Sequence, residues 1–223
     1  MSFRPRQLAL SLDHAENYAR EDFLSGPCNE GALQLLECWP DWPANAIALI
    51  GPEGSGKTHL ATMWAATAGA RVISGHALGE DQLLSALATG ALVVEDGAAA
   101  TDQRVLFHLI NLAREEKAFL LFTSCRLPSA WPATIPDLVS RLRALPVVTL
   151  QAPDDEMLRA VIIKIAADRQ LKLDESVVRY LSTHIERSFA AARTAVAALD
   201  SEALRQRRPA TRALAAEIFG GNA

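Results

Sequence analysis

Eight consecutive residues, GPEGSGKT at positions 51–58, have the types and the spacing that bind phosphate groups. They fit the pattern G-x-x-x-x-G-K-[ST] at every fixed position. In such a loop the glycines let successive backbone N–H groups face the phosphates, the lysine adds positive charge, and the last hydroxyl reaches Mg²⁺. The sequence therefore predicts a site for ADP or ATP with Mg²⁺, formed by Gly51, Pro52, Glu53, Gly54, Ser55, Gly56, Lys57 and Thr58.

Two acidic residues, Glu95 and Asp96, end the apolar run LVVED at positions 92–96. On its own, a strand that ends in two acids is often only an exposed strand end. Beside a phosphate loop a second interpretation is favoured, because one carboxylate can hold Mg²⁺ and another can orient or polarise the attacking water. We therefore predict that Thr58 and Glu95 hold the metal and that Glu95 and Asp96 serve catalysis.

The elements that must position these residues alternate between strand and helix along the chain. Strands are expected at 46–50, 71–74, 91–96, 118–124 and 145–150, and helices at 58–69, 81–89 and 102–117. Apolar strands that are buried on both faces and separated by helices are typical of a parallel sheet with helices on each side. The predicted fold class is therefore α/β, a P-loop parallel sheet flanked by helices and followed by a small all-helical domain.

That second domain is indicated by a change of pattern at QAPDDE, positions 151–156, after which only helical periods follow. Acidic residues open the first two helical segments, and a proline lies near the start of the last, as helix N-termini favour. We therefore predict three parts: a tail at 1–14, a nucleotide-binding α/β domain at 15–152 and a helical lid domain at 153–223.

The composition excludes several classes of protein. Half of the 223 residues are hydrophobic and the net charge is −4, which argues against a disordered chain and against a protein that coats nucleic acid. The three cysteines, Cys28, Cys38 and Cys125, have no metal-binding spacing and fit reduced thiols in the cytoplasm. No apolar run is long enough to span a membrane, and the N-terminus lacks the apolar segment of a signal peptide. We expect a soluble cytoplasmic protein without membrane contact.

A segment before the phosphate loop resembles a motif of the DnaA initiator family. NYAREDFLSGPCNEGAL, positions 17–33, is similar to the box that forms the adenine pocket in that family, with matches at Phe23, Gly26 and Asn29 and with Leu24 at the aliphatic position. The resemblance implies that the nucleotide is contacted by Phe23, Leu24 and Asn29, and we add His59, which follows Thr58.

Two segments after the phosphate loop extend this resemblance. LLFTSCRLPSAW, positions 120–131, resembles the sensor 1 strand of the family. DLVSRL, positions 137–142, resembles the segment whose arginine is the finger offered to the ATP of a neighbouring subunit. The resemblance covers most of the chain and implies an AAA+ ATPase with Arg141 as the catalytic arginine, Arg143 being the alternative.

The chain departs from the family pattern at two positions that bear on its own catalysis. Cys125 stands where sensor 1 has Asn or Asp, and a thiol is a weak hydrogen-bonding group for positioning water. In the lid, Ala190 aligns with the sensor 2 arginine, while Arg187 and Arg193 lie about one turn to either side; either can replace it, and Arg193 is assigned to the nucleotide site. We therefore expect a chain that binds nucleotide and hydrolyses it poorly.

Within the DnaA-related proteins, the sequence resembles the Hda family of regulatory inactivators. Only 95 − 57 = 38 positions separate Lys57 from Glu95, too few for the helical insertion that grips single strands in initiators, and no DNA-binding domain is expected after the lid. Hda proteins start with a clamp-binding hexapeptide QL-x-L-x-L, which here is matched at Gln7, Leu8, Leu10 and Leu12.

This resemblance implies a function and a set of partners. The chain is expected to bind the DNA polymerase III sliding clamp (its β subunit), to contact DNA only through the clamp, and to stimulate hydrolysis of ATP bound to DnaA; a homodimer is allowed. Three alternatives stay open: a helicase-loader or transposition-helper ATPase, a clamp adaptor that holds ADP without hydrolysing ATP, and a P-loop kinase. The segment DLVSRL and the helical domain favour an AAA+ protein over a kinase.

Overall fold

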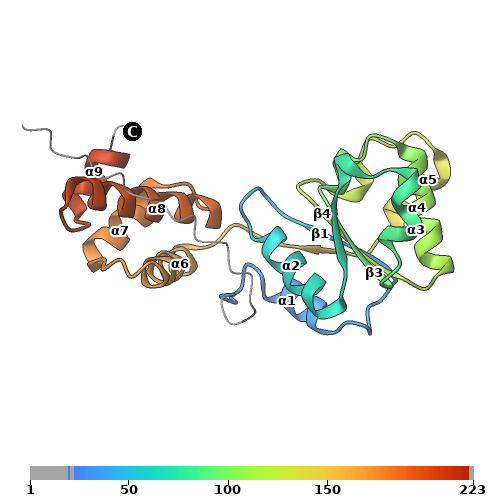
Figure 1. The fold of residues 1–223 in the computed structure, drawn as a ribbon, viewed down its shortest axis with the longest axis horizontal. Helices are drawn as coiled ribbons and strands as arrows, with labels where there is room; N and C mark the ends of the chain where they lie inside the picture. Colours follow the sequence, from blue (N-terminus) through green and yellow to red (C-terminus); the bar gives the residue numbers. More distant parts are fainter. Residues whose placement is uncertain (1–19, 21–22, 221–223) are drawn as a thin grey trace, which may run out of the picture. The chain divides into compact units, whose positions relative to one another are not determined.

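The computed structural model of the chain describes Arg20 and residues 23–220. These residues divide into two compact units, one ending at Ala152 and the other beginning at Pro153 (Figure 1). Each unit has its own hydrophobic core. The first unit carries the sheet and the phosphate loop, and the second is wholly helical.

The first unit is built on a parallel five-stranded sheet in the order β2-β3-β4-β1-β5. The three central strands are rich in Leu, Ile, Val and Phe and almost wholly buried. A strand covered on both faces needs this composition. The α/β fold class predicted from the sequence is confirmed, with strands β1 Ala46–Ile50, β2 Arg71–Ser74, β3 Ala91–Glu95, β4 Phe119–Ser124 and β5 Val147–Thr149.

The two edge strands differ from the expectation that every strand is buried on both faces. Val72 in β2 is 47% exposed and Val147 in β5 is 41% exposed. Among the residues that the structure describes, both strands pair on one side only. Strand β2 also has polar residues at both ends, and the pairing order, which a sequence pattern does not report, puts both strands at the edges of the sheet.

Helices cover both faces of the sheet. Because side chains alternate along a strand, Ile47 and Leu49 pack with α1 and α2, whereas Ala48 and Ile50 belong to the cluster that contains α3, α4 and α5. Figure 1 shows α1 and α2 on one side of the strands and α3, α4 and α5 on the other. These helices are α1 Glu30–Glu37, α2 Lys57–Ala68, α3 Leu83–Ala86, α4 Gln103–Glu115 and α5 Pro136–Ala144, of which α1 and α5 were not predicted as helices.

Between residues 153 and 220 the second unit is a bundle of four helices around a core that includes Leu158, Leu181 and Leu199. Side chains cap several of its helices; Asp154, for example, accepts a hydrogen bond of 2.8 Å from the Met157 N–H. Its helices are α6 Asp155–Asp168, α7 Glu175–His184, α8 Phe189–Gln206 and α9 Arg212–Phe219. Across the described ranges, no helix combines the length and the apolar character needed to cross a bilayer.

Candidate functional site

Three segments with polar residues meet at the carboxyl edge of the sheet. The phosphate loop follows β1, Cys125 follows β4, and Asp96 follows β3. Since β4 lies between β1 and β3, the order of the strands places Cys125 between the loop and the acidic pair. Open α/β sheets bind their ligands at this edge, which makes it the candidate nucleotide site.

The phosphate loop has the backbone conformation that its glycines allow. Gly54 and Gly56 have φ angles of 69° and 94°, in the left-handed region where glycine carries no steric cost. Gly56 is also the N-cap of α2, and Lys57 is the first residue of that helix. The backbone N–H groups of the first helical turn therefore have no partner within the helix and are suited to an anion.

Buried contacts hold the base of the loop. A Cβ atom added to Gly51 would lie 2.9 Å from the carbonyl oxygen of Leu150 and 2.7 Å from Ser55 Oγ. Ser55 is 2% exposed, and its Oγ has no hydrogen-bond partner among the described residues. A close-packed turn that leaves a buried hydroxyl unsatisfied fits a loop shaped around a ligand.

We expect Gly51→Ala to destabilise the first unit by about 1–3 kcal/mol, because the new methyl group must displace backbone atoms of Leu150. Urea unfolding followed by circular dichroism measures the loss. The matched control is Gly31→Ala in α1, where an added Cβ meets no atom within 4 Å and where alanine is expected to stabilise by up to about 1 kcal/mol. Equal unfolding midpoints for the two variants would contradict the close packing at Gly51.

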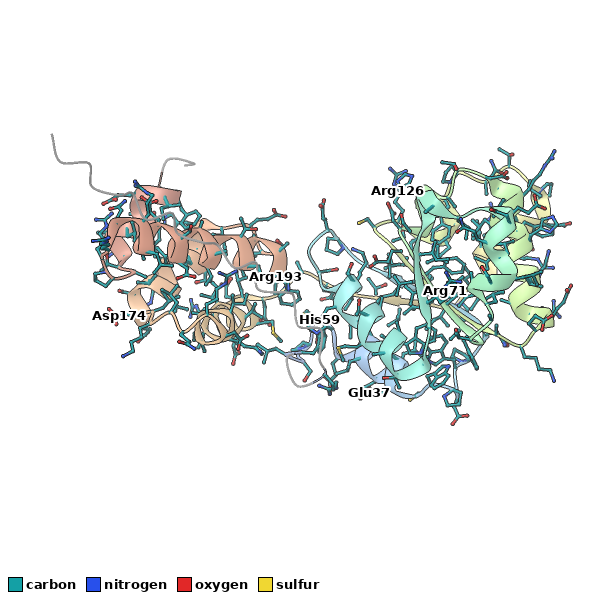
Figure 2. All side chains as sticks on the ribbon, in the orientation of Figure 1. Glu37, His59, Arg71, Arg126, Asp174 and Arg193 are labelled. Carbon is teal, nitrogen blue, oxygen red and sulfur yellow. The ribbon has the colours of Figure 1, made fainter. Side chains whose placement is uncertain are left out.

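Lys57 links the phosphate loop to the end of β4. Its Nζ donates hydrogen bonds of 2.8 Å to the carbonyl oxygens of Gly51 and Pro52. The same Nζ lies 3.6 Å from Sγ of Cys125, which is exposed. Cys125 is therefore adjacent to the predicted phosphate-binding ammonium group, and the exposed Arg126 follows it in the chain (Figure 2).

The acidic pair lies at the end of the neighbouring strand β3. Glu95 is half-buried and Asp96 is exposed. Asp96 has a φ of 49° and donates its backbone N–H to Oγ1 of Thr123 in β4 at 3.1 Å, which fixes the turn that follows the strand. Thr58, in the first turn of α2, is exposed.

These positions suit Mg²⁺ better than a metal held wholly by protein. Throughout Arg20 and residues 23–220, no three His, Cys, Asp or Glu side chains gather to hold an ion. Mg²⁺ is commonly held by one or two protein groups together with phosphates and water. The binding of Mg²⁺ by Thr58 and Glu95 remains a prediction, with these two side chains as the oxygen ligands from the protein.

The predicted adenine-pocket box is folded around Asn29. This side chain is 2% exposed. Its Oδ1 accepts from the Gly26 N–H at 2.9 Å, and its Nδ2 donates to the Leu24 carbonyl at 3.0 Å. The backbone N–H of Gln151, after β5, donates to the carbonyl of Cys28 at 2.9 Å. Asn29 therefore fixes the shape of the box, and the hydrogen bond to Cys28 ties it to the sheet.

Phe23, in the predicted adenine-pocket box, contacts the helix that follows the phosphate loop. Its ring lies edge-on to the ring of His59, with centroids 5.2 Å apart and an interplanar angle of 74°. His59, labelled in Figure 2, lies on α2 directly after Thr58. The structure thus places two residues predicted to contact the nucleotide next to each other, although they are far apart in the sequence.

Arg141 lies in the second half of α5 and is half-buried. Its Cζ is 5.4 Å from the centroid of the Phe107 ring in α4. Arg143, the alternative finger, is exposed. Sequence reasoning missed Phe107, since an aromatic residue within an amphipathic helix gives no sign of the cation above it.

Two further predicted arginines belong to the helical unit. Arg193 is half-buried on α8 of the helical unit (Figure 2). Arg187, the other sensor 2 candidate, forms an ion pair of 2.7 Å with Asp155. The predicted clamp-binding residues Gln7, Leu8, Leu10 and Leu12 lie outside the described residues.

Sequence comparisons relate the chain to replication proteins. Residues 154–218 match the family model described as the Hda lid domain. A curated relative, the chromosomal replication initiator protein DnaA 2 of Chlamydia caviae, is 28% identical over 191 residues, which are 72% of this chain and 41% of that protein. The chain thus spans about two fifths of the length of that relative.

Solved structures share the fold. Domain III of the Thermotoga maritima replication initiation protein DnaA has a TM-score of 0.74 at 20% identity, over 92% of this chain and 96% of that chain. AMPPCP-bound DnaA from Aquifex aeolicus has a TM-score of 0.66 at 20% identity, over 85% and 69%. The Thermotoga maritima RuvB branch migration motor has a TM-score of 0.71 at 15% identity, over 90% and 70%.

At these identities the solved structures show the fold alone, and the lid match and the Chlamydia caviae relative add similarity in sequence. The chain therefore has the fold of DnaA domain III and sequence similarity to a DnaA protein, and its residues 154–218 match the Hda lid domain.

Proposed function

We propose that this chain is a negative regulator of replication initiation. Its tail binds the DNA polymerase III sliding clamp, and its AAA+ core stimulates hydrolysis of the ATP held by DnaA. The observation that carries the proposal is the occurrence, in one chain, of the sequence pattern of a phosphate loop and of a match to the Hda lid domain. The product is ADP-bound DnaA, which does not start a further round of replication, and DNA is contacted only through the clamp.

The core first binds its own adenine nucleotide. The N–H groups at the start of α2 and the Lys57 ammonium neutralise the phosphates, and Thr58 and Glu95 hold Mg²⁺. The box around Asn29 and the ring of Phe23 receive the base. When bound, the nucleotide supplies the negative charge and the base that complete the docking-competent shape of the core.

The core then acts on the ATP of its partner. The Arg141 guanidinium enters the DnaA active site and stabilises the charge that develops on the γ-phosphate during hydrolysis. Arginine fingers raise such rates by about 10³–10⁵-fold. The chain's own turnover is slow, because Cys125 provides only a thiol at the place where an amide or a carboxylate would position water.

The tail sets the local concentration of the core at DNA-loaded clamps. An extended segment places Gln7 in a polar pocket and Leu8, Leu10 and Leu12 in an apolar groove of the clamp. Tethering raises the effective concentration of the core near DnaA on the same DNA. The two proteins therefore meet more often, without new contacts between them.

Removal of residues 1–12 should abolish the clamp-dependent stimulation while leaving nucleotide binding unchanged. The assay combines the protein with ATP-loaded DnaA and DNA-loaded clamp and follows phosphate release. Within the full chain, Leu8→Ala together with Leu10→Ala should reproduce the loss, and Ser11→Ala at a variable position of the hexapeptide is the matched control.

The outcomes separate the candidate functions. Clamp binding without any stimulated hydrolysis indicates the nucleotide-bound adaptor instead of the inactivator. Undiminished stimulation by the shortened chain shows that the hexapeptide is not the tether. Binding to single-stranded DNA in the absence of the clamp, with no effect on DnaA, indicates a helicase-loader type of protein.

A further inference from the structure

We propose that Phe107 is the positioning residue of Arg141: its ring holds the guanidinium at a fixed place on the surface before the partner arrives. This inference rests on the function proposed above, since it assigns a role to a residue that acts through the finger. The direct observation is the position of the Arg141 guanidinium over the ring, with Cζ 5.4 Å from the centroid. Both side chains are half-buried, so the contact is partly shielded from water.

The two helices that carry these residues are fixed relative to each other. In α5, Leu138 and Leu142 are 0% and 2% exposed and belong to the main core cluster. Ahead of α5, the backbone N–H of Thr134 donates to Oε1 of Gln103 in the first turn of α4 at 2.6 Å. The segment before α5 is therefore held to α4 by a hydrogen bond, and α5 itself is held by its buried leucines.

Two residues of α4 contact α5 or the segment before it, and one of them contacts Arg141. Gln103 and Phe107 are four residues apart and so lie on one face of the helix. That face thus contacts the segment before α5 through Gln103 and the second half of α5 through Phe107. Arg141 follows Leu138 by three residues, which places its aliphatic part beside the buried stripe of α5 and its head over the ring.

Arg143 provides the contrast on the same helix. It lies two residues beyond Arg141, is exposed, and makes no ring contact within the part of the chain that the structure describes. A free arginine side chain must lose rotamer freedom when it enters a partner's active site, whereas a stacked one has already lost part of it. The geometry thus favours Arg141 over Arg143 as a finger because Phe107 orders it in advance.

Phe107→Leu should lower the maximal rate of DnaA-bound ATP hydrolysis by about two- to fivefold, the value of a partly exposed cation–π contact. The concentration of the protein that gives half-maximal stimulation should stay unchanged. Phe107→Tyr keeps a ring and should retain the full rate. In an Arg141→Ala background, Phe107→Leu should have no further effect, because the residue acts only through the finger.

A spectroscopic measurement tests the contact without DnaA. In the full chain, the Arg141 Nε–H resonance should show an upfield ring-current shift that persists in Phe107→Tyr and disappears in Phe107→Leu. Thermal unfolding of each variant checks the fold, and Phe107→Met replaces Phe107→Leu where the latter does not fold.

The outcomes distinguish this inference from the proposed function. If the wild-type chain does not stimulate hydrolysis, the proposed function fails, and the role of Phe107 fails with it. If Arg141→Ala removes stimulation while Phe107→Leu keeps the full rate, the proposed function stands and the positioning role is refuted. An equal loss from Phe107→Leu in both backgrounds, or an unshifted Arg141 resonance in the wild type, also refutes it.

Discussion

Arg141→Ala is expected to remove the stimulation of DnaA-bound ATP hydrolysis, with a loss of about 10³-fold or more in the stimulated rate, equivalent to about 4 kcal/mol of transition-state stabilisation. The physical reason is that a guanidinium compensates negative charge that develops only in the transition state, so its removal affects the rate and spares binding. Phosphate release from ATP-loaded DnaA in the presence of DNA-loaded clamp is the measurement.

The controls for this prediction follow from the structure. Nucleotide affinity and clamp affinity of Arg141→Ala should equal those of the wild type, and loss of the contact with Phe107 should lower stability by only about 0.5–1 kcal/mol. Arg143→Ala, an exposed arginine on the same helix, should keep full stimulation. If Arg143→Ala loses activity and Arg141→Ala does not, the finger is Arg143; if neither does, the chain offers no finger from α5.

The fold could be predicted because its signals are local in the sequence. The run AIALI before GPEGSGKT predicted a buried strand that enters a phosphate loop, and β1 Ala46–Ile50 leads into that loop as expected. The acids at 154–156 predicted the start of a helix, and Asp154 caps α6. In each case one short segment contains both the apolar pattern and the residue that begins or ends the element.

Contacts between distant segments could not be predicted in the same way. Helix α1 was not predicted; its N-cap residue Asn29 bonds the Gly26 N–H and the Leu24 carbonyl instead of the helix, and its apolar residues pack against α2 and the sheet. The approach of Lys57 to Cys125 joins positions 68 apart in the chain. The cation–π contact of Arg141 with Phe107 likewise depends on how α4 and α5 pack, which no local pattern contains.

The site shows the same division between local and distant information. The residue types of the phosphate loop identify its chemistry, and positive φ angles at Gly54 and Gly56 agree with it. The sequence could assign Asn29 to the box by resemblance alone. The structure adds a physical reason for that residue, since one buried amide satisfies both the Gly26 N–H and the Leu24 carbonyl.

Lys57→Ala should weaken ADP and ATP binding by about 10- to 100-fold, because a charge-assisted hydrogen bond to phosphate contributes about 1.5–3 kcal/mol. The effect on folding should be small, since Lys57 is half-buried and water can replace it at the Pro52 carbonyl, where the hydrogen bond is exposed. Titration of the full chain with a fluorescent adenine nucleotide measures the affinity, and thermal unfolding without nucleotide measures the stability.

Lys172→Ala is the matched control for Lys57→Ala, because it removes the same charge from an exposed position in the helical unit. Its nucleotide affinity should equal that of the wild type. Lys57→Ala should also lower the stimulated hydrolysis of DnaA-bound ATP, because the core must hold its own nucleotide before it docks. Wild-type affinity in Lys57→Ala would show that the loop after β1 is not the phosphate site, whereas weak nucleotide binding with full stimulation would separate the regulatory activity from the bound nucleotide.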